Sequence, residues 1–161
     1  MEKLLELLSE NARLTVSQLA VMLNQSEKEV EAAIENYEKA GVIKGYQTVI
    51  NWEKADQNKA TALIEMRVTP KPNRGFDDIA RRIMEFDEVE SVSLMSGGYD
   101  LAVMVSGESM HQIADFVARR LSLLDSVLST ATHFMLKKYK DRGVIFDDEN
   151  STDPRGSVLG D

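Results

Sequence analysis

Six consecutive residues, MSGGYD from Met95 to Asp100, combine groups that suit a small charged ligand. The adjacent glycines leave backbone N–H groups open to close approach by a carboxylate. The Asp100 side chain offers an acceptor for an ammonium group. Together these groups match the two charged ends of a free amino acid. The alternative interpretation is a plain type I′ hairpin turn at Gly97 and Gly98, with Asp100 in a structural role.

Composition argues against most other chemistry. The absence of cysteine excludes disulfides and thiolate metal sites, and two histidines, His111 and His133, make a histidine metal site improbable. The sequence shows no nucleophile–base pair or phosphate loop, so we expect no cofactor, no metal and no enzymatic activity. No stretch approaches the ~18 apolar residues of a membrane span. The acidic start, MEKLLELLSENAR, does not resemble a signal peptide, so we expect a cytoplasmic protein with no membrane partner.

A second candidate is SEKEVEAAIENYEKAGVIKGY, Ser26–Tyr46, which is laid out like the reading helix of a DNA-binding domain. Its helix carries five glutamates against two lysines, the wrong sign for a phosphate backbone. Part of this charge has a structural cause, because Ser26 and Glu29 fit a capping box and Glu35 can pair with Lys39. Two interpretations stay open: a helix that reads DNA, and a scaffold helix with a solvated face.

Three short helices must position this stretch. Apolar residues recur at helical spacing in EKLLELLSE, in TVSQLAVMLN and after Ser26. Asn24 and Gln25 form the break before the third helix, since asparagine tolerates left-handed backbone, and Gly41 is a plausible stop. This layout indicates a helix-turn-helix, with a small helical interaction module as the alternative. We interpret VIKGYQTVI, 42–50, as one or two short strands around Gly45, which would make the domain winged.

The rest of the chain predicts a second domain with the order strand, helix, strand, strand, helix, strand. ATALIEMRVT alternates as a half-buried strand does, and VESVSLMS and YDLAVMVSG flank the glycine turn. SVLSTATHFMLKKYK is the last strand. This order is the ferredoxin-like βαββαβ arrangement of an α+β fold, whose open sheet face usually needs a second subunit. The predicted helix faces are Phe76, Ile79, Ile83 and Phe86 in the first helix, and Met110, Ile113, Val117, Leu121 and Leu124 in the second.

We therefore divide the chain into a winged helix-turn-helix at 1–50, a polar linker at 51–59 and a ferredoxin-like domain at 60–140. An acidic tail at 141–161 is predicted to be disordered. The net charge of −8 is shared unevenly, but no segment is a basic arm, and KKYK at 137–140 is too short to count as a nucleic-acid patch. We expect Arg81, Arg82, Arg119 and Arg120 to be solvated, and His133 to be structural.

Several stretches, in this order and spacing, resemble the Lrp/AsnC (feast/famine) family of prokaryotic transcriptional regulators. ARLTVSQLAVMLNQS is similar to the family's GRISNAELAxxVGLS, and IENYEKAGVIKGYQTVIN to its xxRLEExGVIxGYxAxLN. MSGGYDLAVMV is similar to its VSGxYDxLLxV, and the long final strand with Thr130 and Thr132 also fits. The resemblance covers roughly residues 2–140.

The resemblance implies partners. Members of this family bind double-stranded operator DNA as homodimers, pair through their C-terminal sheets and often assemble into octamers. A small molecule, often an amino acid, binds between dimers and shifts assembly or DNA affinity. On that basis the candidate DNA contacts are Arg13, Ser17, Ser26, Lys28, Asn36 and Lys44. The implied effector cleft is lined by Ser96, Gly97, Gly98, Tyr99 and Asp100, with further hydrogen bonds from Thr130, Thr132 and His133.

The chain departs from the family pattern on its reading helix. Relatives commonly place arginine or lysine at the positions of Ala32, Ala33 and Asn36, and many have aspartate where this chain has Gly98. The missing cations predict weak, salt-sensitive binding to DNA. A glutamate can still accept a hydrogen bond from cytosine N4.

Two functions follow. The first is a transcriptional regulator that senses an amino acid or similar metabolite. The alternative is an effector-binding or assembly protein of the same fold that has lost sequence-specific DNA binding. Some proteins of this architecture decarboxylate sirohaem with histidine and paired basic residues, but the equivalent GVIKGYQTVI contains neither.

Overall fold

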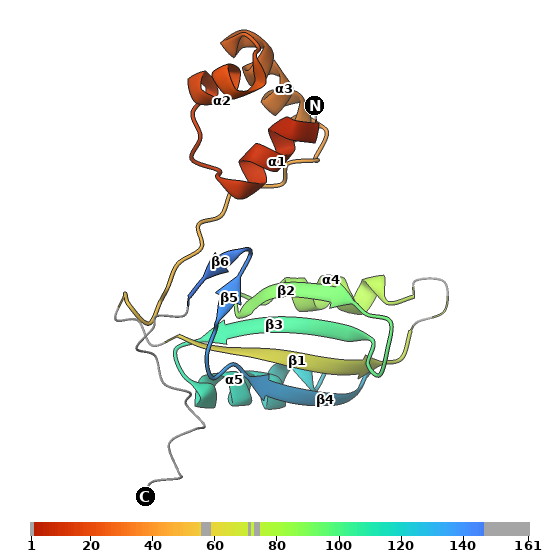
Figure 1. Cartoon of the computed structure of the whole chain (residues 1–161). Helices are drawn as coiled ribbons and strands as arrows, with labels where there is room; N and C mark the ends of the chain where they lie inside the picture. The colour runs from red at the N-terminus through yellow and green to blue at the C-terminus, as the bar shows by residue number, and fades with distance from the viewer. Residues whose placement is uncertain (1, 56–58, 71, 73–74, 147–161) are drawn as a thin grey trace, which may run out of the picture. The chain divides into compact units, whose positions relative to one another are not determined.

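The computed structural model describes residues 2–55, 59–70, 72 and 75–146. The chain divides into two compact units, Met1–Val49 and Ile50–Asp161. Figure 1 shows the elements of each unit in chain order.

The first unit consists of three helices around a small apolar core. The helices are α1 (Glu2–Glu10), α2 (Val16–Leu23) and α3 (Glu27–Lys39). Each contributes to the core because its apolar residues share one face; the buried members are Leu4, Leu19, Ala20 and Val30. The three predicted helices are thereby confirmed.

Capping boxes start both α2 and α3. The predicted box at α3 is confirmed, because the Ser26 backbone N–H donates to Glu29 Oε2 over 2.8 Å and the Glu29 N–H donates to Ser26 Oγ over 3.3 Å. Thr15 and Gln18 make the same reciprocal pair at α2, which sequence inspection missed although the spacing T-x-x-Q was visible. Each box satisfies backbone donors that a helix start leaves open.

Left-handed residues end α2 and α3 at the predicted positions. Asn24 has φ 53° and ψ 47°, and Gly41 has φ 69°. After α3 the Val42 N–H donates to the Tyr37 carbonyl over 2.9 Å and the Gly41 N–H to the Glu38 carbonyl over 3.0 Å. This is the Schellman arrangement, which turns the chain sharply away from the helix axis.

The strands predicted for 42–50 are not formed, so the first unit has no wing of its own. The Ile43 N–H donates back to the Tyr37 carbonyl, and the Tyr46 hydroxyl donates to Glu38 Oε1. This segment is therefore anchored to the end of α3. A strand requires a neighbouring strand to bond its backbone, and no other segment of the described chain pairs with 42–50.

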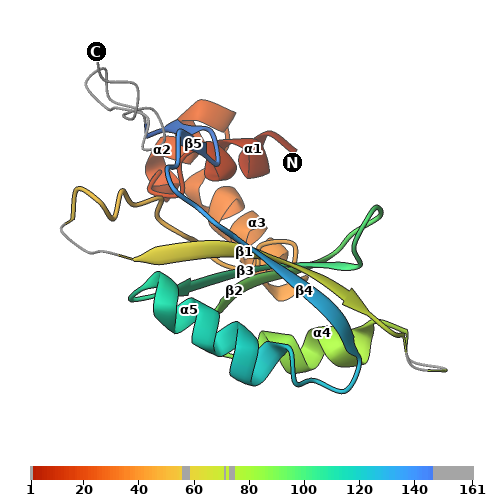
Figure 2. The ribbon, with the colours of Figure 1, turned by 90° about the horizontal axis from the view of Figure 1, so that it is seen from below.

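The second unit has the predicted βαββαβ order. Its four main strands form one antiparallel sheet in the order β2-β3-β1-β4. Figure 2 shows both helices on the same face of this sheet. The elements are β1 (Ala60–Val68), α4 (Asp77–Met84), β2 (Val89–Leu94), β3 (Leu101–Gly107), α5 (Met110–Phe116) and β4 (Val127–Phe134); α5 continues as a π-helical turn, η1 (Val117–Leu121).

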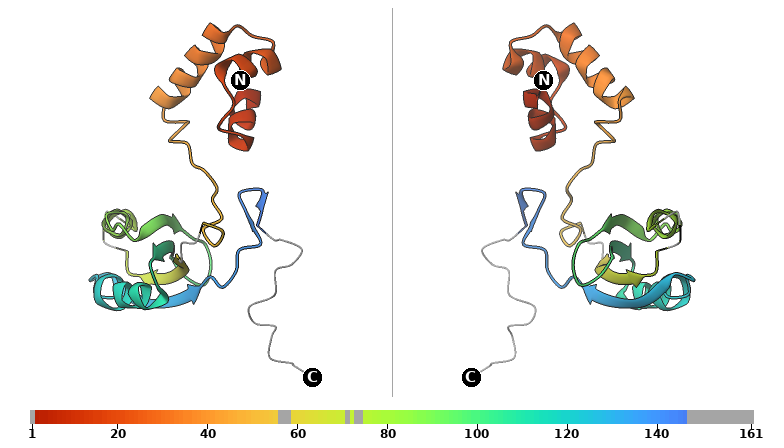
Figure 3. Two further views of the ribbon diagram at one scale, coloured as in Figure 1. Left: turned by 90° about the vertical axis from the view of Figure 1, so that its left-hand side faces the viewer. Right: turned by 90° about the vertical axis from the view of Figure 1, so that its right-hand side faces the viewer.

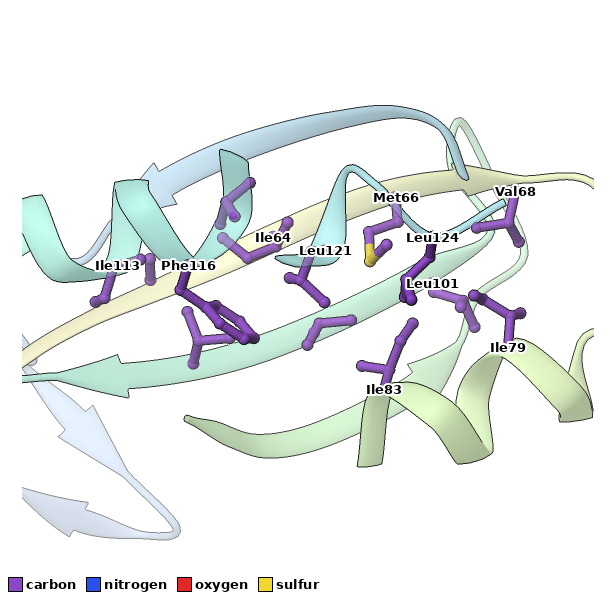
Figure 4. Close-up of a cluster of buried hydrophobic side chains, with 14 residues drawn as sticks. Ile64, Met66, Val68, Ile79, Ile83, Leu101, Ile113, Phe116, Leu121 and Leu124 are labelled. Carbon is purple, nitrogen blue, oxygen red and sulfur yellow. The ribbon is translucent and has the colours of Figure 1, made fainter. Parts of the chain in front are cut away.

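The core lies between the sheet and the two helices. Alternate residues of β1, including Ile64, Met66 and Val68, are buried against α4 and α5, as their spacing predicted. Figure 4 shows them facing Ile79 and Ile83 of α4 and side chains of α5 and η1. Both predicted helix faces are confirmed except at Met110, which is 48% exposed because it lies at the first turn of α5.

A short hairpin follows β4 and replaces the start of the predicted disordered tail. Its strands are β5 (Lys140–Asp141) and β6 (Val144–Ile145). Arg142 and Gly143 have φ 45° and 85°, so both central residues are left-handed, as a two-residue type I′ turn requires. The remainder of that tail, 147–161, lies outside the described residues.

Candidate functional site

One ridge of α3 faces away from the core of the first unit. Because an α-helix has 3.6 residues per turn, side chains opposite the apolar stripe of Val30, Ile34 and Tyr37 fall into this ridge. Its members are all exposed: Lys28, Ala32, Glu35, Asn36 and Lys39. The centre of the ridge is therefore less acidic than the helix as a whole. A double helix that docks here meets two lysines, the Glu35 carboxylate that pairs with Lys39, and the neutral side chains of Ala32 and Asn36.

Three of the five glutamates of α3 have partners inside the unit. Glu35 Oε2 lies 2.9 Å from Lys39 Nζ, which confirms the predicted pair. Hydrogen bonds from the Ser26 backbone and hydroxyl lower the pKa of Glu29. Glu38 accepts the Tyr46 hydroxyl over 2.9 Å, and partial burial, then this bond and the carboxylate charge raise the pKa of Tyr46.

Glu27 and Glu31 are the remaining acids. They lie one turn apart on a flank of α3, and within the described chain neither carboxylate makes a hydrogen bond or ion pair. Glu27 gains from the positive end of the helix dipole, whereas Glu31 lies beyond the first turn. The two glutamates of α3 without a side-chain partner, Glu27 and Glu31, thus lie together on one side of the ridge.

The six candidate DNA contacts are exposed, but their side chains differ in freedom. Arg13 lies in the loop before α2, Ser17 on α2, and Lys28 and Asn36 on the ridge of α3. The Ser26 hydroxyl is engaged in the capping box. The Lys44 ammonium lies over Gly41, where a Cβ would come within 2.8 Å of it. Of the three positions where the resemblance led us to expect cations, Ala33 is half-buried against the core, so only Ala32 and Asn36 lie on the ridge.

The glycine segment is a longer loop than a two-residue turn. Leu94 pairs with Leu101, so residues 95–100 all belong to the connection between β2 and β3. The Met95 N–H donates to the Asp100 carbonyl over 2.8 Å and closes the loop. Gly98 does not have the left-handed backbone that a type I′ turn needs at both central positions. The simple type I′ interpretation is therefore wrong.

Asp100 joins this loop to the end of β1. Its carboxylate Oδ2 accepts the Val68 backbone N–H over 2.9 Å, and its own N–H donates to the Met66 carbonyl over 2.9 Å. Arg67 adds a bond from Nε to the Gly98 carbonyl, also at 2.9 Å. These bonds give Asp100 a structural role. Arg67 is a loop-positioning residue that sequence inspection missed, because only the sheet register brings it near Gly98.

The three candidates on β4 do not share a face. Thr130 and Thr132 pair with Met66 and Ile64 of β1, so they project toward the helix side of the sheet. The Thr130 hydroxyl lies 3.3 Å from the Ser122 hydroxyl, which follows η1.

His133 pairs with Leu63 and projects from the open face. Its Nε2 lies 3.5 Å from Glu65 Oε1. The structure therefore places Thr130 level with the end of β1 where the loop attaches, and His133 farther along the strand on the other side. A single pocket within one chain cannot use both.

Arg120 is exposed, as predicted, but it also packs on two aromatic rings. Its guanidinium carbon lies 4.5 Å from the centre of the Phe86 ring and 5.3 Å from that of Phe116. Arg120 also makes an ion pair with Glu88. The aromatic rings meet edge to face, with centroids 5.4 Å apart. Adjacent Arg119 is exposed, as expected, and among the described residues its ion pair is with Asp115.

Neither a metal site nor a membrane span emerges from the part of the chain that the structure describes. Its histidine, aspartate and glutamate side chains form no group of three that could hold a metal ion. None of its helices combines the length and apolar composition needed to cross a membrane.

Both units match models of known protein families. Residues 2–44 match a winged helix-turn-helix DNA-binding model, and residues 61–145 match the Lrp/AsnC ligand binding domain. Among curated sequences, the chain is 49% identical over 146 residues to YugG of Bacillus subtilis, an uncharacterised HTH-type transcriptional regulator, covering 90% of this chain and 88% of that protein.

Solved structures of such regulators have the same fold. AsnC of Escherichia coli matches with a TM-score of 0.66 at 20% identity, covering 88% of this chain and 93% of that one. A transcriptional regulator from Neisseria meningitidis, solved in complex with L-Met, matches with a TM-score of 0.70 at 24% identity. That match covers 86% of this chain and 89% of the other.

Proposed function

Since this chain belongs to the Lrp/AsnC family of helix-turn-helix transcriptional regulators, we propose that it binds operator DNA through α2 and α3 and that an amino acid or similar metabolite modulates this binding. It acts in the cytoplasm as a homodimer or a higher assembly of dimers. The observation that supports DNA binding is the exposed ridge of α3. It presents Lys28, Asn36 and Lys39 on the helix that matches the helix-turn-helix model.

The proposed effector site is the loop 95–100. Ser96, Gly97 and Gly98 are exposed, and in the described chain the N–H groups of the two glycines donate to no backbone oxygen. These donors suit a ligand carboxylate. The L-Met complex of the Neisseria meningitidis regulator supports testing amino acids first. Asp100 is already bonded to β1, so in this proposal it holds the loop in shape, and the ammonium meets a group from a second chain.

The proposed dimer forms through the open face of the sheet. This face presents mostly small or apolar side chains, and its charged members include Glu65 with His133 nearby. An uncovered sheet face of this kind suits a second antiparallel sheet. The site between dimers and the octamer stay part of the proposal, and the mass of the particle in solution tests them.

DNA binding is tested by retention of genomic fragments on the purified protein at two salt concentrations. We expect retention at low salt that falls steeply at higher salt, because phosphate contacts release counterions. Failure to retain any fragment at low salt would exclude the regulator function. It would favour the second candidate, an effector-binding protein without DNA specificity, for which the unpartnered Glu27 and Glu31 are the supporting observation.

Effector binding is tested by thermal shift against the twenty amino acids. A ligand that binds only the folded state raises the melting temperature, and by more at higher concentration. The variant Gly98→Asp restores the residue that many relatives carry, and it is expected to change which ligands give a shift. The absence of a shift at millimolar concentration for every amino acid would exclude them as effectors.

A further inference from the structure

The densest positive charge of the chain lies on the hairpin after β4, residues 137–146, which we call the basic hairpin. Residues 137–142 hold four basic side chains and one acidic one, in a chain of net charge −8. No six-residue window elsewhere in the sequence has as large a positive charge. The hairpin is therefore a locally positive segment in a protein that is otherwise acidic.

The turn and the strand register shape the basic hairpin. Arg142 and Gly143 form a type I′ turn with left-handed φ at both residues. Asp141 pairs with Val144, and the Phe146 N–H donates to the Tyr139 carbonyl over 2.9 Å.

Side-chain contacts brace it further. Lys138 Nζ lies 2.8 Å from Asp141 Oδ2 and 5.7 Å from the centre of the Phe146 ring, and Lys137 Nζ lies 4.4 Å from the centre of the Tyr139 ring. Lys137 and Lys138 are thereby held against the hairpin.

The basic hairpin borders a groove on the sheet. Residues 137–142 line one side of this groove, and the other lining residues are Glu90, Ser91, Met104 and Met135. Figure 3 shows the hairpin on the side of the sheet away from α4 and α5. At the tip, Lys140 and Arg142 are exposed, and the Lys140 ammonium makes no ion pair within the described residues. Both side chains are therefore accessible to solvent.

The first unit by itself supplies few cations for DNA. Residues 1–49 contain five basic side chains against eight acidic ones, and Lys39 is paired with Glu35. Non-specific affinity for DNA rises with the number of phosphates that lysine and arginine neutralise. A regulator with this helix-turn-helix needs further cations from elsewhere on its surface.

We propose that the tip of the basic hairpin is a second DNA-contacting surface, in which Lys140 and Arg142 bind phosphates without reading the sequence. The inference rests on the proposed DNA-binding function and names a further surface that serves it. Double-stranded DNA carries a negative charge about every 1.7 Å along its axis. The open sheet face of a second copy would offer few carboxylates, of which Glu65 and Glu90 are examples, so DNA suits the tip better.

The test uses the full chain and two double variants that remove the same charge. Lys140→Gln with Arg142→Asn neutralises the tip, and asparagine keeps the left-handed backbone that position 142 requires. Arg81→Gln with Arg82→Gln is the matched control, since both arginines are exposed on α4. Affinity for two duplexes of unrelated sequence is measured over a range of salt, together with the particle mass of each variant.

We expect the tip variant to bind both duplexes more weakly and by the same factor. Its log–log salt slope should be shallower by about 2 per chain, because each lost phosphate contact removes about one counterion. The control variant should have the same affinity and the same salt slope as the wild type. Equal slopes for the two double variants would overturn the inference while leaving the proposed function intact. A change of particle mass without a change of salt slope would also overturn the inference, because the hairpin would then contact a second copy of the chain instead of DNA. A wild type that binds no DNA would overturn both.

Discussion

The Asp100 carboxylate accepts a hydrogen bond from the Val68 backbone N–H at 2.9 Å, across 32 residues of sequence. This bond attaches the loop 95–100 to the end of β1, and it is part-buried. A residue predicted to bind a ligand therefore holds the loop 95–100, the proposed effector site, in place. The two roles are separable by experiment.

Replacing Asp100 with alanine is expected to destabilise the second unit by about 1–3 kcal/mol, because the Val68 N–H loses its acceptor in a part-buried place. Asp100→Asn keeps an acceptor oxygen and should cost less. Urea unfolding followed by circular dichroism measures both. If Asp100→Asn keeps its stability but loses every amino-acid thermal shift, Asp100 contacts the ligand directly. If Asp100→Ala unfolds with the same free energy as the wild type, the hydrogen bond between Val68 and Asp100 does not contribute to stability.

The start of α3 should respond to acid through Glu29. Hydrogen bonds from Ser26 lower the pKa of Glu29 in the folded state. The charged cap therefore stabilises the fold fully above the unfolded pKa of about 4.3, and this contribution is lost as the pH falls through the lower, folded pKa. The melting temperature of Glu29→Gln should lie below that of the wild type at pH 7, and the gap should narrow toward pH 3. A gap independent of pH would contradict this.

Adding a cation to the ridge of α3 is expected to strengthen DNA binding. Ala32→Lys places an ammonium between Lys28 and Asn36, on an exposed position that costs little in helix propensity. The salt slope should steepen by about 1 per chain. Leu123→Lys, at a position 72% exposed on the second unit, adds the same charge away from α3. Equal effects of the two variants would mean that the ridge does not face DNA.

Arg120 should contribute to stability and Arg119 should not. Arg120→Ala removes an ion pair with Glu88 and the contacts with two phenylalanine rings, so we expect a loss of about 1–2 kcal/mol. Arg119→Ala breaks only an exposed 3.7 Å pair and should cost less than about 0.5 kcal/mol. The free energies of unfolding in urea compare the two, and equal values would be inconsistent with a packing role for Arg120.

The sequence by itself determined the parts of the fold that depend on near neighbours. Ser26 with Glu29, Asn24 and Gly41 mark the ends of helices through contacts within about one turn, so their roles were legible without a structure. The buried faces of β1, α4 and most of α5 followed from periodicity for the same reason. Thr132 and His133 are adjacent in a strand, so alternation already implied that they point to opposite faces.

Only the tertiary structure decided which partners distant residues meet. The pairing of β4 with β1 assigned Thr130 to the helix side and His133 to the open side. Packing of two elements brought Arg120 to Phe86 and Glu88, and the sheet brought Asp100 to Val68. Residues 42–50 have strand-like composition but form no strand, because a strand also requires a neighbour to bond its backbone. Pairings of this kind depend on the whole chain, whereas caps and helix periods depend on a few adjacent residues.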